Sequence, residues 1–311
     1  MSKKAIFMGT PDFAVESLRT LIEDGIEIAA VVTAPDRKSG RGQKISMSAV
    51  KQFALKKDLP ILQPEKFKND VFLNELKAFN ADLFIVVAFR MLPEVVWAMP
   101  ELGTINLHGS LLPNYRGAAP INWAVINGEK ETGVTTFFIE KEIDTGKIID
   151  REAILISDTD NAGTIHDKLM GVGANLLSKT VQNIFKGNVD ALPQDNSNLK
   201  HAPKIFKPDC KIDWSLDTVT IYNKIRGLSP YPTAWTEMNC DDSTKTIKLF
   251  NTTCIVDTKN NTNQIKIEEK KVHFGTSNGW IILKDVQLEG KKRMEITALM
   301  NGFDFEKWTL K

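Results

Sequence analysis

The chain of 311 residues is 42% hydrophobic and 25% charged, which is typical of globular proteins and excludes a chain that is disordered throughout. Its length suits two domains. With 40 basic and 39 acidic residues it has no overall charge that would indicate a nucleic-acid or membrane partner, so any site for a polyanion must be local.

Up to about Lys186, short apolar runs alternate with segments of helical periodicity. The apolar runs predict strands over residues 5–8, 26–33, 60–63 and 83–89. The periodic segments predict helices over residues 13–25, 48–58 and 71–79. Strands that alternate with helices indicate βαβ units, so we expect an α/β fold with a doubly wound, mostly parallel sheet. Ligands of such sheets bind beyond the carboxyl ends of the strands.

The composition changes over residues 187–211, where Pro193, Pro203 and Pro208 accompany Asn, Asp and Ser, as in a linker. After a helical segment at 218–228, alternation with period two predicts strands over residues 244–250, 263–274 and 279–288. Asn-Asn, Ser-Asn-Gly and Glu-Gly turns separate them, which favours a small antiparallel, OB-like β-barrel. The expected division is a first domain at 1–187, a linker at 188–208 and a second domain at 209–311.

The cysteines and the apolar runs indicate the cellular compartment. Cys210, Cys240 and Cys254 have no CxxC spacing and are typical of free thiols in a reducing compartment. The apolar run before Gly9 is too short for the core of a signal peptide, and residues 83–89 are too few to span a bilayer. We expect a cytoplasmic protein without a membrane partner.

The first turn, "FMGTPDF" at residues 7–13, follows a strand and opens a helix. It lacks the GxGxxG pattern, and Pro11 removes an amide donor that a pyrophosphate would need. This turn therefore argues against a nicotinamide oxidoreductase and favours a tight turn with Pro at the start of a helix.

A more informative segment is "INLHGSLLPNYRGAAPINWAV" at residues 105–125. Asn106 and His108 are two apart at the end of a strand, so their side chains share one face. An amide donor beside an imidazole suits a reaction in which a carbonyl oxygen gains negative charge while a proton moves. The alternative is a His with a purely structural role.

A carboxylate that could orient this imidazole occurs in "EIDTGKII", where Asp144 lies in a turn before a strand. It could hydrogen-bond the ring, hold one tautomer and stabilise the imidazolium. The alternative is an Asx-turn that only starts the strand.

A local excess of positive charge follows the second strand. Residues 36–58 hold seven basic and two acidic residues, including the glycine-flanked loop "PDRKSGRGQK". Such a run is usually a solvated face, but a loop of this kind can also follow an RNA backbone.

The 44-residue run from Asn106 to Ile149 resembles the signature of the folate-dependent formyltransferases. "GTPDFA", "PDRKSGRGQK", "APKIFKPDCKIDW" and "GKKRM" are similar to the branch of this family that acts on initiator methionyl-tRNA. The resemblance spans the whole chain. It implies a Rossmann-like formyltransferase domain followed by an OB-like domain.

The resemblance implies a site for 10-formyltetrahydrofolate as co-substrate, without a metal. Asn106, His108 and Asp144 fall at the family's catalytic positions, and its folate site corresponds to Ser110, Leu111, Leu112 and Pro113. Phe89 and Arg90 are expected to border the pterin pocket. Here the sequence departs from the usual Ala-Tyr-Gly pattern, because "AFRMLP" has Arg90 at the Gly and one residue fewer.

The second substrate implied is initiator methionyl-tRNA, bound by a monomer through the cations Arg37, Arg41, Lys44, Lys204 and Lys207. The alternatives are a formyltransferase for a small amine such as an amino sugar nucleotide, and a 10-formyltetrahydrofolate hydrolase. A third is a nucleic-acid-binding module on a catalytically silent scaffold, which would leave Asn106, His108 and Asp144 without a role.

Overall fold

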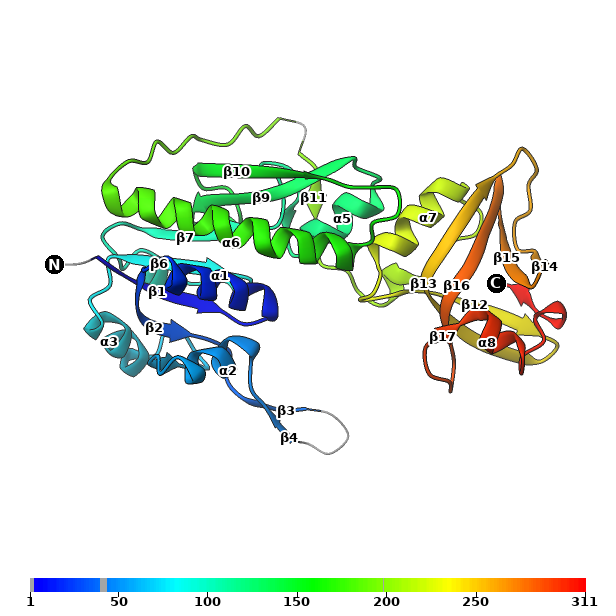
Figure 1. The fold of residues 1–311 in the computed structure, drawn as a ribbon, viewed down its shortest axis with the longest axis horizontal. Coiled ribbons are helices and arrows are strands. Elements are labelled where there is room, and N and C mark those ends of the chain that lie inside the picture. Colours follow the sequence, from blue (N-terminus) through cyan, green and yellow to red (C-terminus); the bar gives the residue numbers. More distant parts are fainter. Residues whose placement is uncertain (1–2, 40–43, 198) are drawn as a thin grey trace. The chain divides into compact units, whose positions relative to one another are not determined.

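The computed structural model describes residues 3–39, 44–197 and 199–311. The chain forms two compact units that are discontinuous in sequence (Figure 1). The first unit comprises the chain up to Gly117, Gly133–Ile154 and His166–His201. The second comprises Ala118–Thr132, Leu155–Ile165 and Ala202–Lys311.

The first unit is built on a seven-stranded sheet with the strand order β10-β9-β7-β6-β1-β2-β5 (Figure 1). Its strands are β1 (Lys4–Gly9), β2 (Glu27–Val32), β5 (Ile61–Leu62), β6 (Leu83–Val87), β7 (Thr104–His108), β9 (Glu131–Phe138) and β10 (Ile148–Leu155). Strands β1, β2, β5, β6 and β7 pair in parallel, whereas β9 runs antiparallel to β7. Residues 5–8 of β1 are completely buried, so both faces of the sheet are covered.

The helices of this unit are α1 (Asp12–Glu23), α2 (Ala49–Lys56), α3 (Asp70–Ala78), α4 (Glu94–Trp97) and, from His166 onward, α6 (Ala162–Lys186). Ser48 caps α2 by accepting from the amide of Lys51, and Asn69 caps α3 by accepting from two amides. Phe72 and Leu76 of α3 pack against Ile6 and Met8 of β1. Helix α6 packs closely on β7, since a Cβ at Gly173 would lie 3.0 Å from Leu107.

Two short pairs of strands lie outside the large sheets, and the first of them is antiparallel. Strand β3 (Arg37–Ser39) pairs with β4 (Lys44–Ser46), and β8 (Arg116–Gly117) pairs with β11 (His201–Ala202). The sequence predicted a loop rather than a hairpin at β3 and β4, because cations and glycines carry no strand periodicity.

The second unit is a curled antiparallel sheet in the order β14-β15-β16-β13-β12-β18, with β17 paired to β16. Its strands are β12 (Ala234–Cys240), β13 (Ser243–Val256), β14 (Ile265–Glu268), β15 (Lys271–Thr276), β16 (Gly279–Leu288), β17 (Met294–Glu295) and β18 (Thr309–Leu310). Its helical segments are α5 (Pro120–Ile126), η1 (Pro208–Cys210), α7 (Thr218–Gly227), α8 (Ile296–Met300) and η2 (Phe305–Lys307). Trp214, Phe274 and Phe305 are buried at its centre.

Residues 263–274, expected as one strand, form parts of two strands. The chain turns at Glu269 and Lys270, which both have positive φ, at 49° and 59°. This geometry is normally provided by Asn or Gly, so the sequence contained no signal for the turn. The fold class is confirmed: a mostly parallel α/β sheet is followed by a curled antiparallel β half-barrel. Of the helices in the described ranges, none combines the length and the apolar character needed to cross a membrane.

Candidate functional site

His108 ends β7, at the carboxyl edge of the parallel strands, and is only 6% exposed. Its Nε2 lies 2.8 Å from the carbonyl oxygen of Tyr115. Because a carbonyl oxygen can only accept, Nε2 carries the hydrogen of this bond. The ring also meets Phe137 edge to face, with centroids 6.4 Å apart. These contacts fix the imidazole, so Nδ1 faces the other way.

The group on the Nδ1 side is Asp144, in the loop between β9 and β10. Its Oδ2 lies 3.7 Å from His108 Nδ1, which is an ion-pair distance but longer than a hydrogen bond. The same oxygen accepts a hydrogen bond of 2.9 Å from the amide of Gly117. Asp144 has a φ of 57°, a left-handed conformation that is uncommon for a residue with a side chain. The structure thus brings together two of the three predicted catalytic residues.

Asn106, the third predicted catalytic residue, is half-buried in β7. It is paired with Val86 of β6 on one side and with Phe137 of β9 on the other. Because strand residues alternate between faces, its side chain leaves the sheet on the same face as that of His108. The two polar groups are therefore neighbours along one strand edge.

The loop after β7 is held by side chains from β9 and β10. Thr135 accepts from the amide of Leu112 and donates to the carbonyl of Ser110, with distances of 3.1 and 2.6 Å. Arg151 donates to the carbonyl of Leu112, and the Ser110 hydroxyl donates to the carbonyl of Asn114. This loop is therefore rigid, and most of its backbone polar groups are bonded within the protein.

The four residues expected at the folate site differ in exposure. Ser110 and Leu112 are completely buried, whereas Leu111 and Pro113 keep part of their side chains accessible. The apolar surface that this loop can offer to a ring therefore comes from Leu111 and Pro113. Leu112 belongs to the protein core.

Phe89 and Arg90 lie in the loop that follows β6, the neighbour of β7. The Arg90 guanidinium donates to the carbonyls of Pro64 and Glu65 and lies 4.1 Å from the centroid of the Phe67 ring. Burial lowers the pKa of Arg90, and the positive charge of Arg37 lowers it further. Phe89 contacts Phe67 edge to face, at 5.8 Å between centroids. Arg90 thus anchors its loop to residues 64–67.

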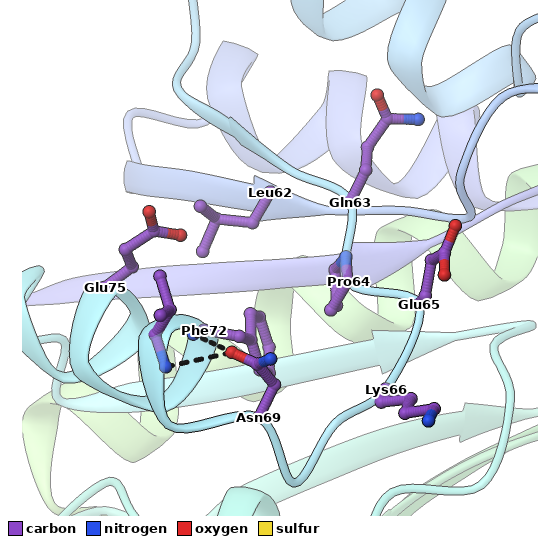
Figure 2. Close-up of a pocket in the computed structure, with 9 residues that line it drawn as sticks. Leu62, Gln63, Pro64, Glu65, Lys66, Asn69, Phe72 and Glu75 are labelled. Carbon is purple, nitrogen blue, oxygen red and sulfur yellow. Dashed lines mark hydrogen bonds between the residues drawn. The ribbon is translucent and has the colours of Figure 1, made fainter.

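A surface hollow of about 480 Å³ adjoins this anchor (Figure 2). Its nine lining residues all lie between Leu62 and Glu75, and they include Pro64 and Glu65. The Asn69 side chain in Figure 2 is engaged in capping α3. None of the predicted catalytic residues lines this hollow, so it is separate from the His108 site.

Two of the cations predicted to bind RNA in the first unit, Arg37 and Lys44, belong to the paired strands β3 and β4. Arg37 is exposed on β3, while Arg41 and the side chain of Lys44 lie outside the described residues. At the base of the hairpin, Lys51 donates to Asp36 at 2.6 Å and to Gln63 at 2.7 Å. These bonds hold the pKa of the Asp36 carboxyl below its usual value. Lys51, one of the seven cations in this segment, is therefore engaged in supporting the hairpin.

Lys204 and Lys207, in the second unit, are both exposed. Lys204 Nζ lies 5.2 Å from the centroid of the Phe206 ring, and Phe206 is 57% exposed. Trp235 donates from Nε1 to the carbonyl of Lys207, which fixes the backbone there. A cationic and aromatic surface with a fixed backbone is typical of contacts with nucleic acids.

Sequence reasoning missed the residues that support the site from a distance. Thr135 and Arg151 hold the loop after β7, while Arg116 and Gln194 hold the Asp144 loop. Gln194 falls within the predicted linker. Their roles depend on tertiary contacts, so no local pattern could have indicated them.

The chain belongs to the formyl transferase family. Residues 3–181 match the family described as formyl transferase, and residues 204–304 match the formyl transferase C-terminal domain. The resemblance to the formyltransferases is thereby confirmed, and the chain is an enzyme of this class. In the parts of the chain that the structure describes, no group of three or more His, Cys, Asp or Glu residues could hold a metal ion.

Relatives within this family agree along nearly the whole chain. The methionyl-tRNA formyltransferase of Azobacteroides pseudotrichonymphae is 54% identical over 310 residues, which cover 96% of this chain and 95% of that protein. The methionyl-tRNA formyltransferase of Parabacteroides distasonis is 52% identical over 309 residues, with the same coverage.

Solved structures share the fold at low identity. The sugar 3N-formyl transferase WlaRD has a TM-score of 0.66 and 21% identity, covering 94% of this chain and all of that chain. HypX from Aquifex aeolicus, in complex with tetrahydrofolic acid, has a TM-score of 0.65 and 18% identity. The match covers 96% of this chain and 47% of HypX.

Proposed function

We propose that this protein transfers the formyl group of 10-formyltetrahydrofolate to the amino group of methionine on initiator methionyl-tRNA. The observation that carries the proposal is the 54% identity, over 96% of the chain, to a methionyl-tRNA formyltransferase. This similarity extends through both units, and because a sugar formyl transferase also matches 94% of this chain, the discrimination rests on the sequence identity and not on the second unit.

The arrangement around His108 suits this chemistry. A neutral amine that attacks the formyl carbon produces a tetrahedral oxyanion, and the folate nitrogen must then leave with a proton. Asn106 donates to the oxyanion, and His108 stabilises it and helps to move the proton. Since Nε2 is bonded to Tyr115, the His108 nitrogen that faces the reaction is Nδ1. Asp144, 3.7 Å away, stabilises positive charge on the ring and positions water.

The folate binds beside the loop after β7. Its ring packs on the accessible parts of Leu111 and Pro113, within the loop formed by Ser110 to Pro113, while Phe89 and Arg90 border the pterin from the neighbouring strand. Support comes from two proteins of the same fold: WlaRD was crystallised in the presence of 5-N-formyl-THF, and HypX in complex with tetrahydrofolic acid.

The RNA contacts come from both units. Arg37, Arg41 and Lys44 belong to the hairpin segment of the first unit, and Lys204 and Lys207 belong to the second. They contribute contacts to several successive phosphates of an RNA backbone, whereas folate has no phosphate and a sugar nucleotide has only a diphosphate. The corresponding domains are a catalytic domain at residues 1–187, a linker at 188–208 that carries Lys204 and Lys207, and a C-terminal domain at 209–311 that adds to the RNA-binding surface. The product serves translation initiation, so we expect the enzyme in the cytoplasm.

Transfer of labelled formyl from 10-formyltetrahydrofolate to charged initiator tRNA tests the proposal. Label on the methionyl group is the expected result. Release of labelled formate without transfer would support the hydrolase instead, and labelling of an amino sugar nucleotide would support the small-amine enzyme.

A further inference from the structure

Gln194 uses the full hydrogen-bonding capacity of its side-chain amide next to the Asp144 loop. Its Nε2 donates to the carbonyls of Asp144 and Gly146, at 2.9 and 2.7 Å. Its Oε1 accepts from Nε and from a terminal nitrogen of Arg116, at 3.0 and 2.6 Å. A guanidinium can only donate and the two carbonyls can only accept, so only one orientation of the amide satisfies all four bonds.

Together with a bond from Gly117, these bonds hold both the backbone and the carboxylate of Asp144. Arg116 directly precedes Gly117, whose amide donates to the Asp144 carboxylate at 2.9 Å. Gln194 therefore links the backbone of Asp144 to the same short segment that binds its side chain. Tyr115, on the other side of Arg116, supplies the carbonyl that binds His108 Nε2. The segment of residues 115–117 thus holds both His108 and Asp144.

The Asp144 loop needs such support because of its conformation. Asp144 has a φ of 57°, and a non-glycine residue keeps this conformation only when its surroundings impose it. The loop is also tight at Gly146, where a Cβ would lie 1.7 Å from the carbonyl oxygen of Phe138. Gln194 binds the carbonyls of both of these residues, so it fixes the turn at the two positions that define it.

We infer that Gln194 is a positioning residue for catalysis, which sets the Asp144 carboxylate relative to His108, and that Arg116 fixes the orientation of the Gln194 amide. The inference rests on the proposed function, since it assigns Gln194 to the same site. In this role Gln194 acts on the reaction through the position of Asp144 and not by binding a substrate.

The decisive variant is Gln194→Glu, which keeps the size and the acceptor for Arg116 but loses both donors to the loop. We expect kcat to fall about 10- to 100-fold, as for other supporting residues of active sites, with the KM for each substrate within about threefold of wild type. Arg116→Lys, which keeps the charge but loses the planar fork, should lower kcat in the same direction. The matched control is Asn196→Ala, because the exposed Asn196 also accepts from Arg116 and, among the described residues, its side chain forms no hydrogen bond to the Asp144 loop.

A double-mutant cycle separates positioning from a general structural role. In the Asp144→Asn background, Gln194→Glu should lower kcat by less than about threefold, because the carboxylate on which it acts is already lost. If Gln194→Glu and Asp144→Asn lowered kcat multiplicatively in the double variant, the inference would be overturned. The same holds if Gln194→Glu had the same kcat as the Asn196→Ala control. Arg116→Lys supplies the same cycle if Gln194→Glu does not fold.

The double-mutant cycle is measured in whichever reaction the wild-type enzyme catalyses, whether that is formyl transfer to an amine or hydrolysis of the formyl donor. Lack of wild-type transfer to methionyl-tRNA contradicts the proposed function alone. The coupling between Gln194 and Asp144 is then measured in the reaction that does occur.

Discussion

His108 and Asp144 face each other across 3.7 Å, with the imidazole held from its far side by the carbonyl of Tyr115. The separation leaves Nδ1 without a direct hydrogen bond to the carboxylate, yet close enough for the two charges to attract each other when the ring is protonated. The electrostatic attraction between the two side chains therefore becomes stronger as positive charge develops on His108. An interaction of this kind favours the transition state over the bound substrates.

This arrangement predicts that Asn106→Ala, His108→Ala and Asp144→Ala lower kcat far more than they weaken folate binding. Loss of the oxyanion donor should cost about 10²- to 10³-fold in rate. The double variant of Asn106 and His108 should show much less than a multiplicative loss, because the groups act as a unit. Single-turnover kinetics together with folate titration measure both effects. Rates within about tenfold of wild type for all three single variants would refute the assignment.

The second prediction concerns the anchor of the loop after β6. Arg90→Ala removes hydrogen bonds to Pro64 and Glu65 and the stacking on Phe67, so the free energy of unfolding should fall by about 1 to 3 kcal/mol. Arg90→Lys should not restore it, because an ammonium lacks the planar fork. The KM for the formyl donor should rise as the loop loosens.

Urea unfolding measures this change in stability, with Arg19→Ala as the control. Arg19 forms an exposed ion pair with Glu16 and lies 5.7 Å from the Phe53 ring, so its removal should cost less than about 1 kcal/mol. Equal effects at the two positions, with an unchanged KM for the donor, would mean that Arg90 is an ordinary surface residue.

The third prediction is a pH dependence in the second unit. His273 is 6% exposed, and among the described residues its Nε2 has no hydrogen-bond partner. Burial lowers its pKa below the ordinary 6.5, although Glu268 opposes this shift. The unfolded chain therefore takes up the proton at higher pH than the folded chain does. The contribution of neutral His273 to the free energy of unfolding is complete above pH 6.5 and is lost as the pH falls below that value.

Thermal unfolding of wild type and His273→Gln across this range tests the prediction. The midpoint of the variant should decline less between about pH 7.5 and pH 5.5, because Gln stays neutral in both states. The exposed His201 provides the control, and His201→Gln should follow the wild-type curve. Parallel curves for wild type and His273→Gln would show that another group causes the acid sensitivity.

The fourth prediction concerns the cations of the second unit. Lys204→Ala and Lys207→Ala should each lower kcat/KM for tRNA and reduce the salt slope by about one unit, if each contacts a phosphate. Folate affinity should not change. Lys130→Ala serves as the control, because Lys130 is also exposed but pairs with Asp158 at 2.7 Å. An unchanged slope for both test variants would mean that this surface is merely solvated.

The parallel sheet could be predicted because a strand buried on both faces appears in the sequence as a continuous apolar run. Residues 83–89 gave β6 in this way, and the end of β7 was correctly expected to carry Asn106 and His108 on one face. In contrast, the turn at Glu269 and Lys270 was missed because neither residue is a usual turn former.

The supporting contacts of the site could not be predicted at all. Gln194 lies 50 residues beyond Asp144, and Thr135 lies 25 residues beyond Ser110, so only the folded chain brings each pair together. The Leu-Leu-Pro run suggests an apolar wall formed by all three side chains, whereas the Leu112 side chain is completely buried and its amide is bonded to Thr135. Local patterns indicate the chemical groups, whereas their positioning depends on contacts distant in sequence.

The most direct test of the proposed function is a competition between acceptors. Wild-type enzyme, labelled 10-formyltetrahydrofolate, charged initiator tRNA, free methionine and an amino sugar nucleotide are combined, and the label in each product is measured. The proposed function predicts that nearly all label is found on methionyl-tRNA, with His108→Ala abolishing it. Preferential labelling of the sugar nucleotide, or of free methionine to the same extent as of the tRNA, would contradict it.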